Sequence, residues 1–261
     1  MSILLRIYKL SLQIVNFFFK IIPRNEKFVL FLSRQGNEAS IDFQYMIEDM
    51  RKRYPKYQVK VLTKRMEKTN VIQIICYVFH PFVQLFYLAK ASICIIDGYQ
   101  MAISCVHHKK GLKIVQIWHS LGAVKKFGYQ TLNTKRDQSW AKIMNMHKQY
   151  DVIVSSSKAM RPYFSQAFVY PEDKFIVCGL PRVDYLKNTV QENRKKVYEL
   201  YPELKKEKVV LYVPTFRTYD EYKIDELIQA FEESDYKLII KIHPRMKIIV
   251  DKKYTYDAVT S

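Results

Sequence analysis

The chain has 261 residues, 49% of them hydrophobic and 14% aromatic, which is enough apolar surface for one large domain or two small ones. This composition excludes disorder as the main state of the chain. The 43 Lys and Arg residues outnumber the 25 Asp and Glu residues and give a formal charge of +18, so the partner should be anionic: nucleic acid, an acidic membrane surface or a phosphorylated substrate.

The first predicted element is an amphipathic helix over residues 2–22. Apolar residues recur there at spacings of three and four, and a narrow polar stripe has the same period: Arg6, Lys9, Gln13, Asn16 and Lys20. Its longest charge-free run, Leu10–Phe19, is about half the length that crosses a bilayer, and no signal-peptide cleavage site follows. We expect this helix in the membrane headgroup layer, with its basic stripe on anionic lipid. The alternative is a helix packed on the protein's own domain.

Strands then alternate with helices. The strands are predicted at Lys27–Ser33, Gln58–Thr63, Ser92–Asp97, Lys113–Trp118, Asp151–Ser155 and Lys174–Cys178. The helices are predicted at Ile41–Tyr54, with Ser40 as N-cap, and at Val71–Ala89, Ser139–Lys148 and Lys158–Ala167. This alternation predicts a parallel sheet covered by helices on both faces. Because His80, Pro81 and Gln84 interrupt the helix Val71–Ala89, we expect it to be buried or interfacial rather than a membrane span.

A charged stretch, Lys187–Lys208, breaks this rhythm, and the alternation resumes after it. The second series comprises strand Val209–Val213, helix Asp225–Glu233, strand Lys237–Ile242 and a short apolar run, Ile248–Val250. It predicts a second unit that begins near residue 187. A nucleotide-binding half of this class generally needs more strands than these, so we expect the chain to end in the middle of a domain.

Polar and basic residues follow four of the predicted strands, where open parallel sheets bind their ligands. The four segments are Trp118–Gly128 (WHSLGAVKKFG), Gly179–Asp184 (GLPRVD), Pro214–Arg217 (PTFR) and His243–Arg245 (HPR). Backbone amides and basic side chains at strand ends can surround a phosphate group. The sequence therefore predicts a phosphate-binding site at this edge of the sheets.

In their motifs and order, these segments resemble the CDP-glycerol:glycerophosphotransferase family of wall teichoic acid synthesis. Members carry Trp-His-Gly or Trp-His-Ala leading to lysine, then Gly-x-Pro-Arg-x-Asp, Pro-Thr-Phe-Arg and His-Pro, and the resemblance covers Lys27 to Arg245. Ser120 departs from the family pattern, and the family's later Asp-Tyr-Ser-Ser donor segment is not found. The resemblance implies an α/β fold of GT-B type, with two Rossmann-like domains and parallel sheets. The expected parts are the helix 1–22, an acceptor-side domain 23–186 and an incomplete donor domain 187–261.

The implied reaction moves glycerol phosphate or ribitol phosphate from CDP-glycerol or CDP-ribitol to an undecaprenyl-diphosphate-linked teichoic acid precursor. An acceptor hydroxyl attacks the β-phosphate of the donor and CMP leaves. Such a transfer needs an oriented nucleophile and neutralised phosphate charge, and no separate cofactor is expected. The enzyme would be peripheral, on the cytoplasmic side of the cell membrane, where anionic lipid attracts its basic surplus.

The resemblance also implies roles for individual residues. His119 is the expected general base because imidazole titrates near neutral pH, and His243 would donate to the β-phosphate or the departing oxygen; each could instead be a structural histidine. The substrate-binding candidates are Arg217, Arg182, Thr215, Asp184, Lys125, Lys126 and Asp97. Asp184 is also the expected ion-pair partner of Arg182, and Asp97 binds acceptor hydroxyls or is a simple turn residue.

Other classes of function fit less well. The four cysteines are spaced too widely for a CxxC pair, which indicates a reducing, cytosolic compartment and no zinc site. No clustered carboxylates predict a protein-held metal, and no module for nucleic acid is recognised. Two alternatives stay open: a GT-B glycosyltransferase that uses a nucleotide sugar, and a truncated, non-catalytic copy that binds membrane or acceptor.

Overall fold

The computed structural model describes residues 2–66, 70–214, 224–232 and 234–241. The chain divides into two compact units, Met1–Asn188 and Thr189–Ser261. The division falls inside a long helix, α7 (Pro181–Leu200). Each unit is described by itself below.

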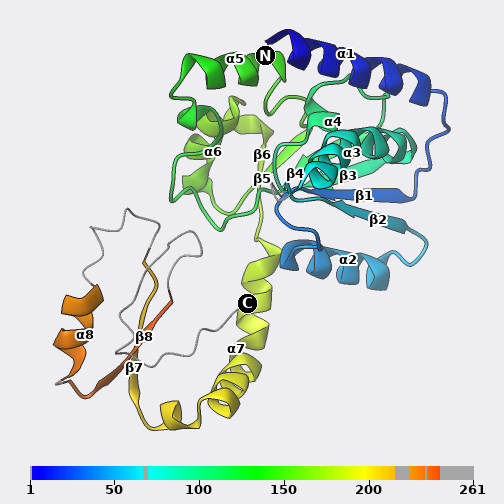
Figure 1. The fold of residues 1–261 in the computed structure, drawn as a ribbon. Helices are drawn as coiled ribbons and strands as arrows, with labels where there is room; N and C mark the ends of the chain where they lie inside the picture. The colour runs from blue at the N-terminus through cyan, green and yellow to red at the C-terminus, as the bar shows by residue number, and fades with distance from the viewer. Residues whose placement is uncertain (1, 67–69, 215–223, 233, 242–261) are drawn as a thin grey trace. The chain divides into compact units, whose positions relative to one another are not determined.

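The first unit is built on a six-stranded parallel sheet (Figure 1). Its strands are β1 (Phe28–Ser33), β2 (Gln58–Thr63), β3 (Ile93–Ile96), β4 (Lys113–Gln116), β5 (Val152–Ser155) and β6 (Phe175–Val177). Their order is β2-β1-β3-β4-β5-β6, which confirms the predicted strands and their parallel arrangement. Strand β2 lies on one side of β1, and β3 and all later strands lie on its other side. The direction in which the chain adds strands therefore reverses between β1 and β3. Ligands of open sheets bind at the carboxyl ends of strands at such a reversal.

Helices cover both faces of this sheet. They are α1 (Ser2–Phe19), α2 (Ile41–Arg53), α3 (Val71–Lys90), α4 (Met101–Ser104), α5 (Lys135–Ile143) and α6 (Arg161–Phe168), followed by α7. Figure 1 shows α2 on one face and α3 and α4 on the other, with α1 lying outside α3. The predicted N-cap of α2 is confirmed, since the Ser40 side chain accepts a hydrogen bond from the Phe43 amide.

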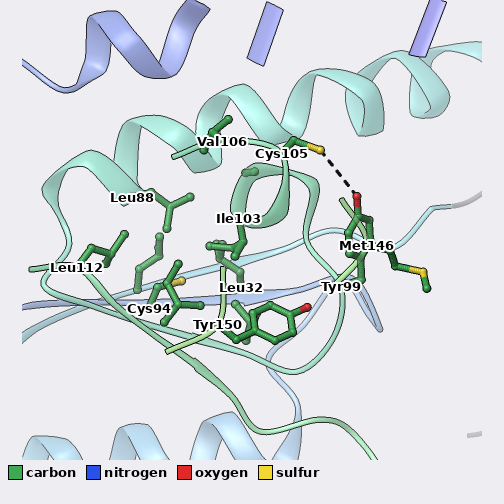
Figure 2. Close-up of a cluster of buried hydrophobic side chains, with 14 of the residues drawn as sticks. Leu32, Leu88, Cys94, Tyr99, Ile103, Cys105, Val106, Leu112, Met146 and Tyr150 are labelled. Atoms are coloured by element: carbon green, nitrogen blue, oxygen red, sulfur yellow. Dashed lines mark hydrogen bonds between the residues drawn. The ribbon is translucent and has the colours of Figure 1, made fainter. Parts of the chain in front are cut away.

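The two faces carry separate hydrophobic cores because successive residues of a strand point to opposite sides. In β1, Val29 and Phe31 are fully buried in a cluster with Phe43 of α2. Leu30 and Leu32, also fully buried, belong to the larger cluster on the opposite face. Figure 2 shows part of this larger cluster around α4, where the Tyr99 hydroxyl and the Cys105 thiol lie 3.9 Å apart.

Helix α1 presents its polar stripe to the protein. The side chains of Lys9, Gln13 and Asn16 donate hydrogen bonds of 2.8, 3.1 and 3.0 Å to backbone carbonyl oxygens in α5 and just after α4, and Leu12 is fully buried. The prediction that this stripe faces anionic lipid is therefore wrong for these three residues. Long polar side chains can reach the carbonyl groups at helix ends, which need partners, so the alternative of a helix docked on its own domain holds for this face.

The opposite face of α1 is apolar and exposed, and so is the first half of α3. We call the following residues the apolar surface: Ile3, Leu4, Ile7, Leu10, Ile14, Phe17 and Phe18 of α1, with Val71, Ile72, Ile75 and Phe79 of α3. The two helices contact each other, and the Tyr8 hydroxyl donates to the Val78 carbonyl at 2.7 Å. By length and composition alone, both helices could cross a membrane, although the second half of α3 is buried through Leu85 and Leu88.

Two helices differ from the prediction. The helix expected at Ser139–Lys148 is α5 and begins earlier, because the Thr134 side chain caps it by accepting from the Asp137 amide. Left-handed φ angles at Asn145 and His147 end it early. The charged stretch after residue 187 continues helix α7, which has no buried residue in the described chain.

The second unit has the predicted strand, helix and strand. They are β7 (Lys208–Tyr212), α8 (Ile224–Glu232) and β8 (Tyr236–Ile240). The two strands pair in parallel, in register from Lys208 with Tyr236 to Tyr212 with Ile240. A helix between two parallel neighbouring strands is the connection that such pairing requires.

Candidate active site

His119 lies at the carboxyl edge of the first sheet, three residues after β4. The Gln116 side chain joins the ends of two strands there, since its amide nitrogen donates to the Gly98 carbonyl at 3.2 Å and its oxygen accepts from the Trp118 amide at 2.9 Å. Trp118 has a φ of +60°, a left-handed conformation that is uncommon for a bulky residue. Its ring lies 4.0 Å from the His119 ring, centroid to centroid, and stacks on Phe127 at 4.6 Å.

The tautomer of His119 follows from the one hydrogen bond that its ring makes in the described chain. Its Nδ1 lies 2.7 Å from the backbone carbonyl oxygen of Asp97. A carbonyl can only accept, so Nδ1 carries the proton and Nε2 keeps a lone pair in the neutral ring. Burial lowers the pKa of His119, the charges of Arg182 and Arg34 lower it further, and the hydrogen bond to Asp97 acts in the opposite direction. The ring is therefore neutral near pH 7 and can accept a proton at Nε2.

The Asp97 carboxylate is buried beside this histidine. The residue is 1% exposed, and neither carboxylate oxygen has a hydrogen-bond partner of ordinary geometry in the described chain. Burial raises its pKa to about 6, opposed by the nearby Ser33 hydroxyl and Arg182. Perturbed carboxyl groups of this kind concentrate at functional sites. The predicted contact with acceptor hydroxyls would require an opening to this carboxylate, which is closed to solvent here.

Arg182 holds the site together from the first turn of α7. Its backbone amide and Nε donate to the Asp42 carboxylate at 2.8 and 2.7 Å, and Nη2 also pairs with that carboxylate. Its Nη1 donates to the His119 carbonyl oxygen at 2.9 Å. The prediction that Asp184 pairs with Arg182 is therefore wrong: Asp184 is exposed, because its position in the same helical turn directs it away from the arginine's partners.

Sequence reasoning missed Asp42. It is 2% exposed and lies in the first turn of α2, directly after the cap and Ile41. An acidic residue at that position is usually explained by the helix dipole, which hides a long-range pairing across 140 residues. The only hint of this pairing in the sequence was the arginine of the Gly-x-Pro-Arg segment, because a half-buried arginine needs a carboxylate partner.

The segment after His119 is fixed at its far end by Gly128. This glycine has a φ of +57°, and a Cβ there would lie 2.2 Å from the Ala167 carbonyl oxygen, so only glycine fits. Between the two fixed ends, Lys125 and Lys126 are exposed. The structure thus places these two lysines on the surface of the loop that carries the candidate base.

Three predicted site residues, Thr215, Arg217 and His243, lie outside the described residues. Within the described ranges, no group of three His, Cys, Asp or Glu side chains is placed to hold a metal ion. The four cysteines are free thiols, with Cys94 and Cys105 buried and Cys76 and Cys178 exposed. Among the predicted residues that are described, His119, Asp97 and Arg182 come together.

Known proteins with similar sequences include two teichoic acid primases. The sequence is 30% identical to the teichoic acid ribitol-phosphate primase of Bacillus spizizenii, over 87% of this chain and 61% of that protein. It is 25% identical to the teichoic acid glycerol-phosphate primase of Bacillus subtilis, over 99% of this chain and 70% of that protein. The chain thus spans 61% and 70% of the lengths of these two relatives.

The solved structure of the wall teichoic acid polymerase TagF aligns with a TM-score of 0.60 at 19% identity, over 93% of this chain and 63% of that one. This likeness confirms the predicted α/β fold of GT-B type. The family profile for CDP-Glycerol:Poly(glycerophosphate) glycerophosphotransferase matches residues 14–261. The chain belongs to this glycerophosphotransferase family.

Proposed function

We propose that the protein transfers a polyol phosphate from a CDP-polyol to a lipid-linked teichoic acid precursor on the cytoplasmic side of the cell membrane. The observation that carries this proposal is His119, a neutral imidazole whose Nε2 is left to accept a proton at the carboxyl edge of the sheet. Membership of the glycerophosphotransferase family supports CDP-glycerol as the type of donor.

In the proposed reaction, His119 Nε2 takes the proton of an acceptor hydroxyl. The hydroxyl oxygen then forms a bond to the β-phosphorus of the donor, and the bond from that phosphorus to the CMP oxygen breaks. CMP leaves with the electron pair, and the product is a phosphodiester. Enzymes of phosphoryl transfer act mainly by positioning the reactants and balancing charge.

Arg182 acts in this proposal as a positioning residue. Its Nε, Nη1 and Nη2 donate to Asp42 and to the His119 carbonyl, so its guanidinium fixes the loop of the base. Charge balance at the phosphates is then assigned to Arg217, Thr215 and His243, on the family resemblance of their motifs, with Lys125 and Lys126 on the exposed loop. No separate cofactor enters this scheme.

The polyol is open between glycerol and ribitol, because primases named for both are among the similar proteins. Product analysis tests the reaction class: the purified protein is incubated with each CDP-polyol and lipid acceptor. A phosphodiester product and free CMP support the proposal. A glycoside formed from a nucleotide sugar, with no CMP from either CDP-polyol, would establish the glycosyltransferase alternative instead.

The membrane contact is assigned to the apolar surface of α1 and α3, with a bilayer of anionic phospholipid as its occupant. Its members are large exposed side chains, for example Phe17 at 70% and Ile72 at 72% exposed, and an exposed patch of this kind marks an interaction site. The charge of +18 favours an anionic bilayer.

Co-sedimentation with phosphatidylglycerol vesicles tests this contact. The fraction of protein bound to the vesicles should fall in a Phe17→Gln, Ile72→Gln double variant. Val124→Gln, an exposed apolar residue outside the surface, is the control and should bind as the unchanged protein; equal binding of all three proteins would refute the assignment.

A further inference from the structure

A small pocket lies at the carboxyl ends of β1, β2 and β3, where the strand order reverses. Its lining includes Arg34 directly after β1, Lys64 directly after β2, Tyr99 and Gln100 after β3, and His80 and Gln84 of α3. The described lining contains no Asp or Glu. The space inside it is about 10 Å³, enough for one water-sized group and far too small for a nucleotide.

The buried wall of this pocket has polar atoms without partners. His80 Nε2, Gln84 Oε1 and Gln100 Nε2 lack a hydrogen-bond partner in the described chain. The two glutamines are 2% and 4% exposed, and they share one long contact of 3.4 Å. Buried polar atoms without partners are rare and destabilising. Gln84 Oε1 can accept a hydrogen bond and Gln100 Nε2 can donate one. A single hydroxyl group can satisfy both atoms, because a hydroxyl both donates and accepts.

The outer wall is cationic and adjoins the candidate base. Arg34 and Lys64 are half-buried, and the Arg34 guanidinium lies over the Tyr99 ring, 5.9 Å from its centroid. Arg34 is also near enough to His119 for its charge to lower the pKa of that histidine. The pocket is therefore bounded by α3, the helix whose first half belongs to the apolar surface, and by Arg34, whose charge acts on His119.

We propose that a phosphorylated polyol group binds at this pocket, with one hydroxyl inside it between Gln84 and Gln100 and the phosphate at its outer wall, on Arg34 and Lys64. This inference rests on the proposed function, in which the acceptor is lipid-linked, and it assigns the subsite that holds the acceptor's headgroup. The placement explains how a headgroup anchored at the apolar surface presents a free hydroxyl to His119. Guanidinium and ammonium groups supply the phosphate contacts, and the paired amides favour a ligand with an alcohol hydroxyl separate from its phosphate over inorganic phosphate.

Calorimetric titration of the full chain with sn-glycerol 3-phosphate and with inorganic phosphate tests this subsite. Lys64→Ala should weaken binding of both probes about tenfold, whereas Gln100→Leu should weaken only glycerol 3-phosphate. Arg65→Ala, which removes an exposed charge next to Lys64 but outside the pocket lining, should change either affinity less than twofold. Gln84→Met repeats the amide test if Gln100→Leu does not fold, which thermal melting will reveal.

Vesicles containing phosphatidylglycerol or only phosphatidylcholine distinguish a lipid headgroup from a free polyol phosphate. A loss of phosphatidylglycerol selectivity in Lys64→Ala supports a lipid headgroup, and a loss confined to soluble glycerol 3-phosphate supports the free ligand. No glycerol 3-phosphate binding at millimolar concentration, or equal binding by Lys64→Ala and Arg65→Ala, would overturn the subsite.

Failure of the subsite and failure of the proposed function are distinguishable. If Lys64→Ala weakens glycerol 3-phosphate binding but the protein releases no CMP, the subsite is supported and the proposed function is contradicted. CMP release with an unchanged acceptor KM in Lys64→Ala keeps the function and overturns the subsite.

Discussion

The ring of His119 is held by the backbone of Asp97, through a hydrogen bond of 2.7 Å from Nδ1 to the carbonyl oxygen. Because the acceptor is a main-chain group, no change of the Asp97 side chain removes it. The position of the base and the buried Asp97 carboxylate can therefore be tested separately by mutation. The same bond links the residues that follow β3 and β4.

The titration of His119 should occur below the ordinary histidine pKa of 6.5, because burial is the largest cause and lowers it. Nitrogen or carbon NMR of labelled protein, with the His119→Gln variant to assign the signal among six histidines, measures this directly. Any activity that needs the neutral ring should therefore fall with decreasing pH at a lower pH than it would with an ordinary histidine. A His119 pKa at or above 6.5 contradicts the buried, neutral base.

Asp97 should make the fold less stable as pH rises. Its pKa is raised from 3.8 to about 6, so the folded state holds its proton more tightly than the unfolded state. The cost is small near pH 4, disappears as pH falls well below 3.8, where both states are protonated, and is nearly complete above about pH 6. Relative to the unchanged protein, Asp97→Asn should therefore gain on the order of 2 kcal/mol in unfolding free energy between pH 4 and pH 8. Urea denaturation at both pH values measures this gain, and a pH-independent difference would show that the carboxylate has a partner.

The Asp42 pairing should be a main stabilising contact of the site. Asp42→Asn leaves the half-buried Arg182 guanidinium without its carboxylate and should cost about 2 kcal/mol in urea denaturation. Glu192→Gln is the matched control, since it removes an exposed ion pair with Lys196 on α7 and should have no measurable effect. Equal effects of the two substitutions would mean that the buried pair contributes no more than a surface pair.

Gly128 should not tolerate a side chain. A Cβ there would collide with the Ala167 carbonyl in a left-handed backbone conformation, so Gly128→Ala should cost about 2 kcal/mol or more. Gly179→Ala is the control because a Cβ at that position meets nothing within 4 Å. Thermal melting compares them, and a melting temperature of Gly128→Ala within a degree of the control would show that the loop after His119 is not fixed as described.

The sequence predicted the strands and the parallel sheet well, because alternating apolar runs and strand-end motifs are local signals. It did not predict the partner of Arg182, since Asp42 is 140 residues away and only the fold brings the two together. Helix α7 was missed because its many charged residues were taken as a break, although Val183, Leu186, Val190 and Val197 recur in it at helical spacing without being buried. Its signals were Pro181 at the helix start and the Glu192 to Lys196 pair. The predicted orientation of α1 was wrong for its polar stripe. Polar side chains that donate to backbone carbonyls recur along a helix with the same period as polar side chains that face lipid headgroups.

The most direct test of the account is CMP release from CDP-glycerol and CDP-ribitol, measured with a lipid-linked acceptor and three proteins. The unchanged protein should release CMP only when acceptor is present, and His119→Ala should reduce the rate by about 10²–10⁴. His107→Ala alters an exposed histidine on another loop and should leave the rate near that of the unchanged protein. No CMP from either donor, or a His119→Ala rate equal to that of His107→Ala, would contradict the account.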